Sequence, residues 1–327
     1  MLILSFKKGQ GLGNQLWNYV VLRSVAEHNN YEFKLLNYDL FLAKDFLKLQ
    51  ISDTKKVFEK KLFNSYKEKS LFDTKLKCFI HLFDEQIFNV NDNTIIEWIL
   101  QSEEYLRPSI DIINKYIKLK DKNNSLINRK NTCILNIRGG EYKRHRELIL
   151  PKSYWLNAMA NMKRFKNKID FKIVTDDFAY ASTLFPSIEI IKGGIKEDFM
   201  NLFFCKYAIL SNSSFGYFPI KLGTPPDIVI APNHWARFGN KYERWASPSN
   251  IYKDWLWQDK NGEIRKPAEI EKSIFDLNRV YASYNVYTTE DFFKKKTLKD
   301  FLPKRLRNLL KRLLSKLFPL YVGYLKK

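Results

Sequence analysis

Residues 1–36, MLILSFKKGQGLGNQLWNYVVLRSVAEHNNYEFKLL, decide the fold class of this chain. Residues 1–6 are mostly apolar and predict a short strand, which is followed by a turn with three glycines, GQGLGN (9–14). From Asn14 to His28 the apolar side chains recur with a helical period, which predicts a helix. Tyr31–Leu36 predicts a second strand, so the chain opens as a β–α–β unit.

The second half of the chain repeats this alternation more regularly. Its apolar runs have the length of buried strands: 132–137, 170–175, 187–191, 207–211 and 227–231. Helices are expected between these strands, beginning near Pro151, Asp177, Glu197 and Ser214. Apolar strands that alternate with helices are typical of a parallel sheet covered on both faces. We therefore predict an α/β fold of two Rossmann-like lobes facing across a cleft, with the site outside the carboxyl ends of the strands.

The polar stretch 118–131, KLKDKNNSLINRKN, has no apolar period and predicts the linker between the lobes. Within the first lobe, a strand is expected near Thr94–Leu100 and a helix over about Ser102–Lys118. Residues 40–93 show no pattern that orders them. The expected organisation has three parts: an N-terminal lobe at 1–125, a C-terminal lobe at 130–293 and a tail at 294–327.

The composition excludes several classes of protein. Of the 327 residues, 45% are hydrophobic and 15% aromatic, which excludes a disordered or collagen-like chain. The three cysteines (Cys78, Cys133 and Cys205) are far apart and the four histidines form no HExxH or HxxxH pair, so no disulfide framework or metal motif is predicted. The N-terminal apolar run is too short for a signal-peptide core, and no segment reaches the ~18 apolar residues of a membrane-spanning helix. We expect a chain that stays inside the cell.

The net charge of +21 is concentrated towards the C-terminus. Residues 294–327 contain twelve Lys or Arg and one acid, Asp300, so the tail carries about half of the excess charge. A nucleic-acid-binding protein would spread its basic residues over a folded face, and we therefore expect no nucleic-acid partner. The pattern predicts a basic amphipathic helix on an anionic membrane surface, or a helix packed on the second lobe with solvated charges. Its leucines and its basic residues fall on opposite helical faces: Leu306, Leu309, Leu310, Leu313, Leu314 and Leu317 against Lys304, Arg305, Arg307, Lys311, Arg312 and Lys316.

The glycine turn after the first strand is the first candidate site. A dinucleotide fingerprint, GxGxxG, would need a glycine at Asn14 or Leu16, and a P-loop would need a lysine after the glycines. With both motifs excluded, the turn is interpreted as a helix start that binds an anion. Gly11 and Gly13 leave its backbone N–H groups accessible, and the Asn14 amide is a further donor. The alternative is a tight strand-to-helix turn with Asn14 as its N-cap.

The segment NIRGGEYKRHRE (136–147) is the second candidate site. Arg138 stands directly at the carboxyl end of a predicted strand, where its guanidinium fork matches a phosphate and stays charged at any working pH. Gly139 and Gly140 let the backbone approach a ligand closely. The alternative is a solvated basic loop.

Two further strand ends carry polar clusters. Asp176 and Asp177 are adjacent acids, and no DxD occurs in the chain, so a divalent metal bridging a diphosphate is not expected. Ser213 and Ser214 stand at a helix start, where hydroxyl and N–H groups suit an anion, and Asp198 lies in the preceding helix. The alternative for both clusters is helix capping.

In this order the motifs resemble those of glycosyltransferase family 11, the α-1,2-fucosyltransferases within the wider fucosyltransferase superfamily. The resemblance covers about residues 2–257 and implies a GT-B fold. It also implies that the first lobe faces the acceptor, while the second lobe binds the nucleotide sugar, GDP-fucose. The segments that carry it are GLGNQLWNYVVLRSVA (11–26), ILQSEEYLRP (99–108), NIRGGEY (136–142), DDFAYASTLFP (176–186), DFMNLFFCKYAILSNSSFGYFP (198–219), IAPNHW (230–235) and IYKDWLW (251–257).

The resemblance also implies roles for single residues. Arg138 would hold the β-phosphate, and Asn14 with its glycines would face the diphosphate and the fucose. The other residues implied at the donor pocket are Asn136, Asp177, Asp198, Ser213 and Ser214.

This chain departs from the family pattern at three positions. Asn136 replaces a histidine, Gly139 replaces a second arginine, and Glu141 replaces an aspartate. Lys143 and Arg144 are the nearby cations that could replace the lost arginine.

The function implied by the resemblance is a metal-independent, inverting transfer of fucose from GDP-fucose to a glycan or glycolipid acceptor, at the 2-hydroxyl of a β-galactoside, in the synthesis of a surface polysaccharide. Glu141 and Glu147 are the candidates for taking up the hydroxyl proton. We expect no metal or other cofactor, and a cytoplasmic protein peripheral on the inner face of a bacterial-type membrane. The alternatives are the same fold with another GDP-sugar or acceptor, a sugar-binding protein without catalysis, and a basic nucleic-acid-binding protein.

Overall fold

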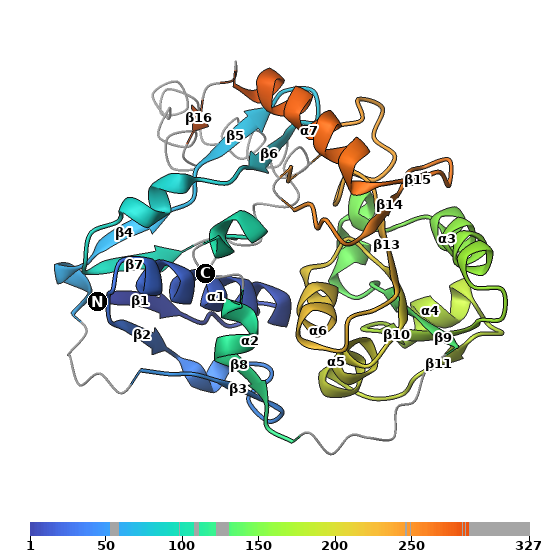
Figure 1. Cartoon of the computed structure of the whole chain (residues 1–327), viewed down its shortest axis with the longest axis horizontal. Coiled ribbons are helices and arrows are strands. Elements are labelled where there is room, and N and C mark those ends of the chain that lie inside the picture. The colour runs from blue at the N-terminus through green and yellow to red at the C-terminus, as the bar shows by residue number, and fades with distance from the viewer. Residues whose placement is uncertain are drawn as a thin grey trace, which may run out of the picture.

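The computed structural model describes residues 1–52, 59–97, 99–107, 111–121, 131–245, 247–248, 250–282, 284 and 286–287. Its two main sheets lie in two lobes placed side by side (Figure 1). The predicted α/β class with two lobes built on parallel sheets is confirmed. The tail expected at 294–327 lies outside the described residues.

The first lobe is built on a parallel sheet with the strand order β2-β1-β7-β4. Its strands are β1 (Leu2–Ser5), β2 (Phe33–Leu36), β4 (Asn64–Lys67) and β7 (Thr94–Glu97). Helix α1 (Leu12–His28) connects β1 to β2, which confirms the predicted β–α–β opening. Nearly all of α1 is buried, because the sheet covers one side of the helix and the second lobe covers another.

The second lobe is built on a sheet with the order β11-β10-β9-β12-β13-β14-β15. The strands are β9 (Thr132–Ile137), β10 (Asp170–Thr175), β11 (Glu189–Ile190), β12 (Tyr207–Leu210), β13 (Ile228–Pro232), β14 (Leu256–Gln258) and β15 (Ile264–Arg265). The helices are α3 (Lys152–Phe165), α4 (Phe178–Leu184), α5 (Ile195–Phe203) and α6 (Tyr217–Leu222). All neighbouring strands pair in parallel except β14 and β15.

Each sheet has a point at which its strand order reverses. In the second lobe this switch point lies between β9 and β12, and in the first lobe it lies between β1 and β7. Loops leaving the carboxyl ends of strands at a switch point diverge to opposite faces of the sheet and leave a crevice there. The loops that matter are therefore those after β1, β7, β9 and β12.

The predicted helix over residues 102–118 is wrong. The described chain forms a short 3-10 helix, η4 (Glu103–Leu106), and the single turn α2 (Ile112–Tyr116), and then strand β8 (Ile117–Leu119). β8 pairs antiparallel with β3 (Leu47–Leu49), so a partner about seventy residues earlier in the chain overrides the helical pattern.

The region without a predicted order, 40–93, contains a hairpin that reaches the second lobe. It consists of β5 (Ser70–Asp73) and β6 (Cys78–His81), and β16 (Val286–Tyr287) pairs with β5. Helix α7 (Pro267–Tyr281) runs from the second lobe to this hairpin (Figure 1). The remaining 3-10 helices are η1 (Tyr38–Leu40), η2 (Lys60–Leu62), η3 (Glu85–Asn89), η5 (Glu141–Arg144), η6 (Arg146–Leu148) and η7 (Ser214–Gly216).

A buried cluster of aromatic rings joins the two lobes. Trp17 of α1 stacks on Tyr217 of α6 with ring centroids 4.4 Å apart, and Tyr217 contacts Tyr252 at 4.6 Å. Tyr252 in turn contacts Trp255 at 4.5 Å, and all four rings are buried. Large aromatic side chains contribute most per residue to a buried interface, so this cluster holds α1 against the second lobe.

Within the described part of the chain, no helix is both long enough and apolar enough to cross a bilayer.

Candidate functional site

Arg138 lies one residue beyond the end of β9, at the switch point of the second lobe. Its Nη1 forms an ion pair with Oδ2 of Asp176 at 3.0 Å, and the backbone N–H of Gly139 donates to Oδ1 of the same carboxylate at 2.9 Å. Asp176 follows the neighbouring strand β10, so a single carboxylate fixes both the side chain and the turn that follows it. The guanidinium also lies over the ring of Tyr142, 5.6 Å from its centroid.

The arginine retains unused donor capacity. Its Nε is buried and has no hydrogen-bond partner among the residues that the structure describes. A buried donor without a partner carries a desolvation cost of about 1–3 kcal/mol, which an anionic ligand would relieve.

The two glycines after Arg138 are required by close packing. A Cβ atom on Gly139 would lie 2.7 Å from Cδ1 of Tyr180 and 2.8 Å from Cβ of Asp177, and one on Gly140 would collide with Asp176. A second arginine therefore has no room at position 139 in this chain, which gives a physical reason for the difference from the pattern of the family that the motifs resemble.

Lys143 is not an unpaired cation that could replace the arginine of the resembled family at position 139. Its ammonium forms an ion pair with Asp177, and this bond holds the pKa of the Asp177 carboxyl below its usual value. Asp177 also N-caps α4, since its Oδ1 accepts from the N–H of Tyr180 at 3.0 Å, as the capping alternative predicts. Arg144 is exposed in η5.

Asp198, in α5, interacts electrostatically with Asp176 and Arg138. Burial, and after it the negative charge of Asp176, raises the pKa of Asp198 from 3.8 to about 7, while Arg138 acts in the opposite direction. A carboxyl group held near neutrality beside a fixed cation is a common feature of functional sites.

Asp198 permits a pH test that needs no substrate. Because its pKa in the folded chain lies above 3.8, the folded state keeps a proton that the unfolded state loses, and stability falls as the pH rises from about 4 to about 7. We expect Asp198→Asn to remove this fall. Its Tm should be unchanged near pH 4 and raised by several degrees at pH 8, because each kcal/mol of unfolding free energy changes Tm by about 2–4 °C. Thermal melts at both pH values, with Asp170→Asn as an exposed control, measure the difference. An equal Tm shift at both pH values would contradict the assignment.

The turn after β12 carries the two serines. Ser213 is buried and N-caps η7, accepting from the N–H of Phe215 at 3.3 Å. Asn136, also buried, accepts from Ser211 Oγ at 3.4 Å, so its side chain joins the ends of β9 and β12. Tyr142 donates to the carbonyl of Asn212 at 3.2 Å and connects the arginine turn to the serine turn.

The start of α1 in the first lobe contacts this serine turn directly. The hydroxyl of Ser214 donates to Oδ1 of Asn14 at 2.9 Å, and Nε2 of Gln101, in the loop after β7, donates to the same oxygen at 2.6 Å. The switch points of the two lobes therefore meet at Asn14. The alternative in which Asn14 is the N-cap is wrong, because α1 begins at Leu12 with Gly11 as its N-cap.

The glycines of the first turn have different surroundings. A Cβ on Gly13 would lie 2.5 Å from the backbone carbon of Ser214 and 2.7 Å from the nitrogen of Phe215, whereas one on Gly11 would meet nothing within 4 Å. Gly13 thus allows the two lobes to approach, and Gly11 borders open space at the helix start.

The two candidate proton acceptors, Glu141 and Glu147, are exposed and lie in η5 and η6 of the loop after Arg138. Sequence reasoning missed Tyr142 and Gln101 as site residues, although both lie in segments that carry the family resemblance. It treated Asp176 mainly as a capping residue, whereas the structure places its carboxylate on Arg138.

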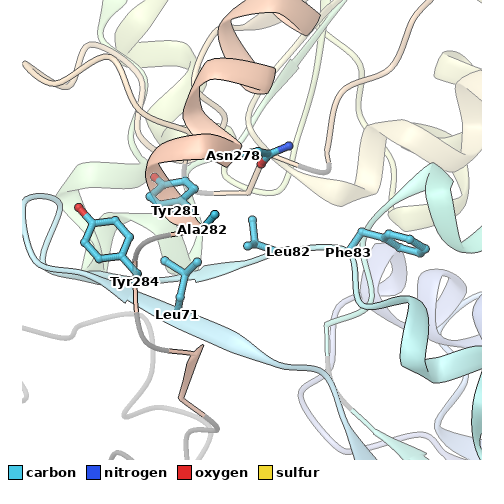
Figure 2. Close-up of a pocket in the computed structure, with 7 residues that line it drawn as sticks. All are labelled: Leu71, Leu82, Phe83, Asn278, Tyr281, Ala282 and Tyr284. Carbon is cyan, nitrogen blue, oxygen red and sulfur yellow. The ribbon is translucent and has the colours of Figure 1, made fainter.

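A cavity of about 360 Å³ lies away from these residues, between the β5–β6 hairpin and the end of α7 (Figure 2). Its lining is mostly apolar and includes none of the predicted site residues: Leu71, Leu82, Phe83, Asn278, Tyr281, Ala282 and Tyr284. No group of three or more His, Cys, Asp or Glu side chains in the described part of the chain could hold a metal ion.

Comparison with known proteins gives fold likeness only. No family model matches the chain, and no curated protein matches its sequence. Among solved structures, the chain is similar to the α-1,6-fucosyltransferase NodZ soaked with GDP-fucose, at 16% identity, with a TM-score of 0.39 over 68% of this chain and 92% of that one. NodZ from Bradyrhizobium in another crystal structure gives a TM-score of 0.42 at 16% identity over the same shares.

The E. coli heptosyltransferase WaaC with ADP is similar over 84% of this chain and 99% of its own, at 9% identity and a TM-score of 0.43. Such identities bear on the fold alone, and TM-scores below 0.5 carry no argument about function.

Proposed function

We propose that this chain is an inverting glycosyltransferase that moves fucose from GDP-fucose to a sugar hydroxyl of a glycan or glycolipid. The observation that supports the proposal most is the meeting of the two switch points, with Arg138 and the Ser213–Ser214 turn on one side and Gly13–Asn14 on the other. The motif resemblance adds GDP-fucose as the donor and the 2-hydroxyl of a β-galactoside as the acceptor position. Surface polysaccharide is the product class that this acceptor suggests.

The donor diphosphate would lie on Arg138. Asp176 occupies only Nη1, so the other donors of the guanidinium are left for a phosphate. Asp176 also fixes the orientation of the fork before a ligand arrives, which lowers the cost of ordering it on binding. The N–H groups at the start of α1 would add partial positive charge.

In the reaction, the acceptor oxygen attacks the anomeric carbon from the face opposite the diphosphate. The bond from that carbon to the phosphate oxygen breaks, and its electron pair leaves with GDP. Arg138 stabilises the charge that builds on the departing GDP, which is where a fixed cation lowers the barrier. The hydroxyl proton passes to a carboxylate. Glu141 and Glu147 remain the candidates, and both are exposed in the loop after Arg138.

The test is a panel of GDP- and UDP-sugars offered to the purified protein, with and without glycan acceptors, with released nucleotide as the measured quantity. We expect GDP release from GDP-fucose, faster when an acceptor is present. Release from a different GDP-sugar would keep the reaction and change the donor. No release from any nucleotide sugar, with or without acceptor, would contradict the proposal.

Turnover is expected to survive chelation, since Arg138 and the start of α1 supply the positive charge that many transferases obtain from a bound metal ion. The same panel run in EDTA should give rates within about twofold of the untreated rate, far less than the tenfold that a change of ~1.4 kcal/mol in the barrier would produce. Loss of turnover in EDTA that manganese restores would show that the metal-free mechanism is wrong.

We also propose that the basic tail binds the inner face of the membrane, where a lipid-linked acceptor would lie. Each basic residue near an anionic leaflet contributes about 1 kcal/mol, so six on one helical face suffice for reversible binding. The full chain should pellet with anionic vesicles and not with neutral ones, whereas a chain that ends at Lys296 should remain in the supernatant and still release GDP. Equal pelleting of the two proteins would contradict this proposal.

A further inference from the structure

The cavity between the β5–β6 hairpin and the end of α7 has no role in the transfer reaction proposed above (Figure 2). Its volume is about 360 Å³, and leucine, phenylalanine and alanine side chains form much of its lining, together with the rings of two tyrosines. These rings, of Tyr281 and Tyr284, have centroids 5.6 Å apart. The cavity is therefore bounded by carbon atoms over most of its wall.

The polar atoms of the two tyrosines are bonded to the surrounding protein. The Tyr281 hydroxyl donates to the carbonyl of Trp245 at 3.4 Å, and the Tyr284 hydroxyl accepts from Nη1 of Arg244 at 3.0 Å. Both hydroxyls point away from the leucines of the cavity (Figure 2). The amide of Asn278 is the remaining polar side-chain group of the lining. A buried water needs several polar partners, so this lining favours an apolar ligand over water.

The side of the cavity formed by α7 is exposed, because both Asn278 and Ala282 are exposed residues of its lining. Phe275 lies three positions before Asn278 and shares its helix face. The apolar side chain of Phe275 is nevertheless 66% exposed. From Phe275 to Ala282 the helix rises by about 10 Å. An apolar surface of this length, continuous with a cavity, suits an extended chain better than a compact molecule.

The wall of the cavity is continuous with the strand that leads into the basic tail. β16 pairs antiparallel with β5, with Val286 opposite Leu71 of the cavity lining. The tail begins at residue 294, seven positions after Tyr287, and an extended chain spans at most about 3.6 Å per residue. The first residue of the tail therefore lies within about 25 Å of β16. A tail bound to an anionic membrane, as proposed above, keeps the cavity close to the bilayer.

The turn of the hairpin carries side chains that suit a membrane surface. The ammonium groups of Lys75 and Lys241 lie 5.7 Å and 5.0 Å from the ring centroid of Tyr242, and all three residues are exposed. Arg244, two positions after Tyr242, donates to Asp73 at the end of β5 at 2.7 Å, which places this group at the hairpin turn. Tyrosine and lysine side chains of this kind are enriched where protein meets the membrane–water interface.

We propose that this cavity binds an acyl chain of a membrane lipid, so that the folded part of the molecule contacts the bilayer together with the tail. The inference rests on the proposed membrane binding of the tail and on no step of glycosyl transfer. Lipid tails are as apolar as leucine, so moving a chain from the bilayer into the cavity changes the free energy little. What the contact adds is a fixed orientation of the cleft relative to the membrane.

Calorimetric titration of hexanoate, octanoate and decanoate into the full chain, without vesicles or nucleotide, measures the affinity for carbon chains. Each added methylene should tighten binding by about fourfold, which corresponds to ~0.8 kcal/mol. Ala282→Phe fills the cavity from an exposed position whose backbone, with φ of −59° and ψ of −23°, is open to phenylalanine. It should weaken decanoate binding by at least about tenfold. Ala160→Phe, at an exposed position of α3, is the matched control and should bind decanoate as the wild type does.

A second measurement locates the chain when it comes from a membrane. The full chain is irradiated with anionic vesicles that contain a phospholipid with a diazirine near the end of one acyl chain, and labelled peptides are identified by mass spectrometry. Label is expected within residues 70–83 or 275–284. It should be lost from both segments in Ala282→Phe and retained in Ala160→Phe.

Absence of decanoate binding, the result expected if the tail or a second copy of the chain fills the cavity, would overturn the proposal. So would a decanoate affinity unchanged in Ala282→Phe, or label confined to residues 294–327. A full chain that does not pellet with anionic vesicles would overturn the membrane binding of the tail and this proposal with it. A failure of glycosyl transfer is recognised separately, because neither measurement uses a nucleotide sugar and GDP release should be the same in Ala282→Phe as in the wild type.

Discussion

Arg138→Ala is expected to lower the rate of GDP release by about tenfold to a hundredfold. A charge-assisted hydrogen bond to phosphate contributes ~1.5–3 kcal/mol, and more in the transition state as negative charge builds on the leaving group. At ~1.4 kcal/mol per factor of ten, the lower bound of that range already gives a tenfold loss. The measurement is the rate of GDP release from saturating and from limiting donor, which separates kcat from KM.

Arg138→Lys should recover little of this loss, because an ammonium cannot span two phosphate oxygens. The stability of the variants is expected to change less than their activity. Arg138 is paired with Asp176 at a partly exposed position, and such pairs contribute about 1 kcal/mol or less, a Tm change of about 2–4 °C. An alanine variant whose Tm falls by much more than this and which turns over donor normally would show that Arg138 has a structural role. The assignment of the donor site would then be wrong.

Gly13→Ala is expected to have the second-largest effect, because the added methyl group meets backbone and not a flexible side chain. Its position 2.5 Å from the Ser214 carbon forces either α1 or the serine turn to move. Overpacking of this kind costs about 1–3 kcal/mol, and the Tm should fall by several degrees. Donor turnover should fall with it, since the displaced turn carries Ser213 and Ser214.

Gly11→Ala is the matched control, two residues away in the same turn. A Cβ at Gly11 meets nothing within 4 Å, and the backbone there is extended, with φ of −67°, a conformation open to alanine. Its Tm should stay within about 1 °C of the wild type, because an unstrained surface substitution rarely changes stability by more than ~0.5 kcal/mol. Equal destabilisation by both substitutions would show that the close contact at Gly13 does not govern the junction.

The second lobe was predictable because its strands are buried on both faces. A strand covered on both sides reads as a continuous apolar run, and β9 and β10 begin and end where those runs do. The first lobe was less predictable because its order depends on distant pairings. β3 pairs with β8 and β5 pairs with β16, and no local pattern in residues 40–93 records such partners.

In the candidate site, too, the features set by local sequence could be predicted and the contacts between distant residues could not. Arg138 and the two serines could be found from sequence, because carboxyl ends of parallel strands meet at one edge of a sheet. The hydrogen bond between Asn14 and Ser214 could not, because it joins residues separated by two hundred positions in different lobes. The exclusion of a second arginine at Gly139 depends on Tyr180 and Asp177, which only the folded chain brings against it.

We propose that a GDP-linked donor binds where the two switch points meet, with Arg138 on its diphosphate. Calorimetric titration of GDP and of UDP into the wild-type chain and into Arg138→Ala, all in EDTA, measures this binding without any acceptor. We predict saturable binding of GDP at one site, weaker binding of UDP, and an affinity for GDP that falls by about tenfold or more in the variant. Absence of GDP binding to the wild-type chain, or an affinity that is the same in Arg138→Ala, would contradict this donor site.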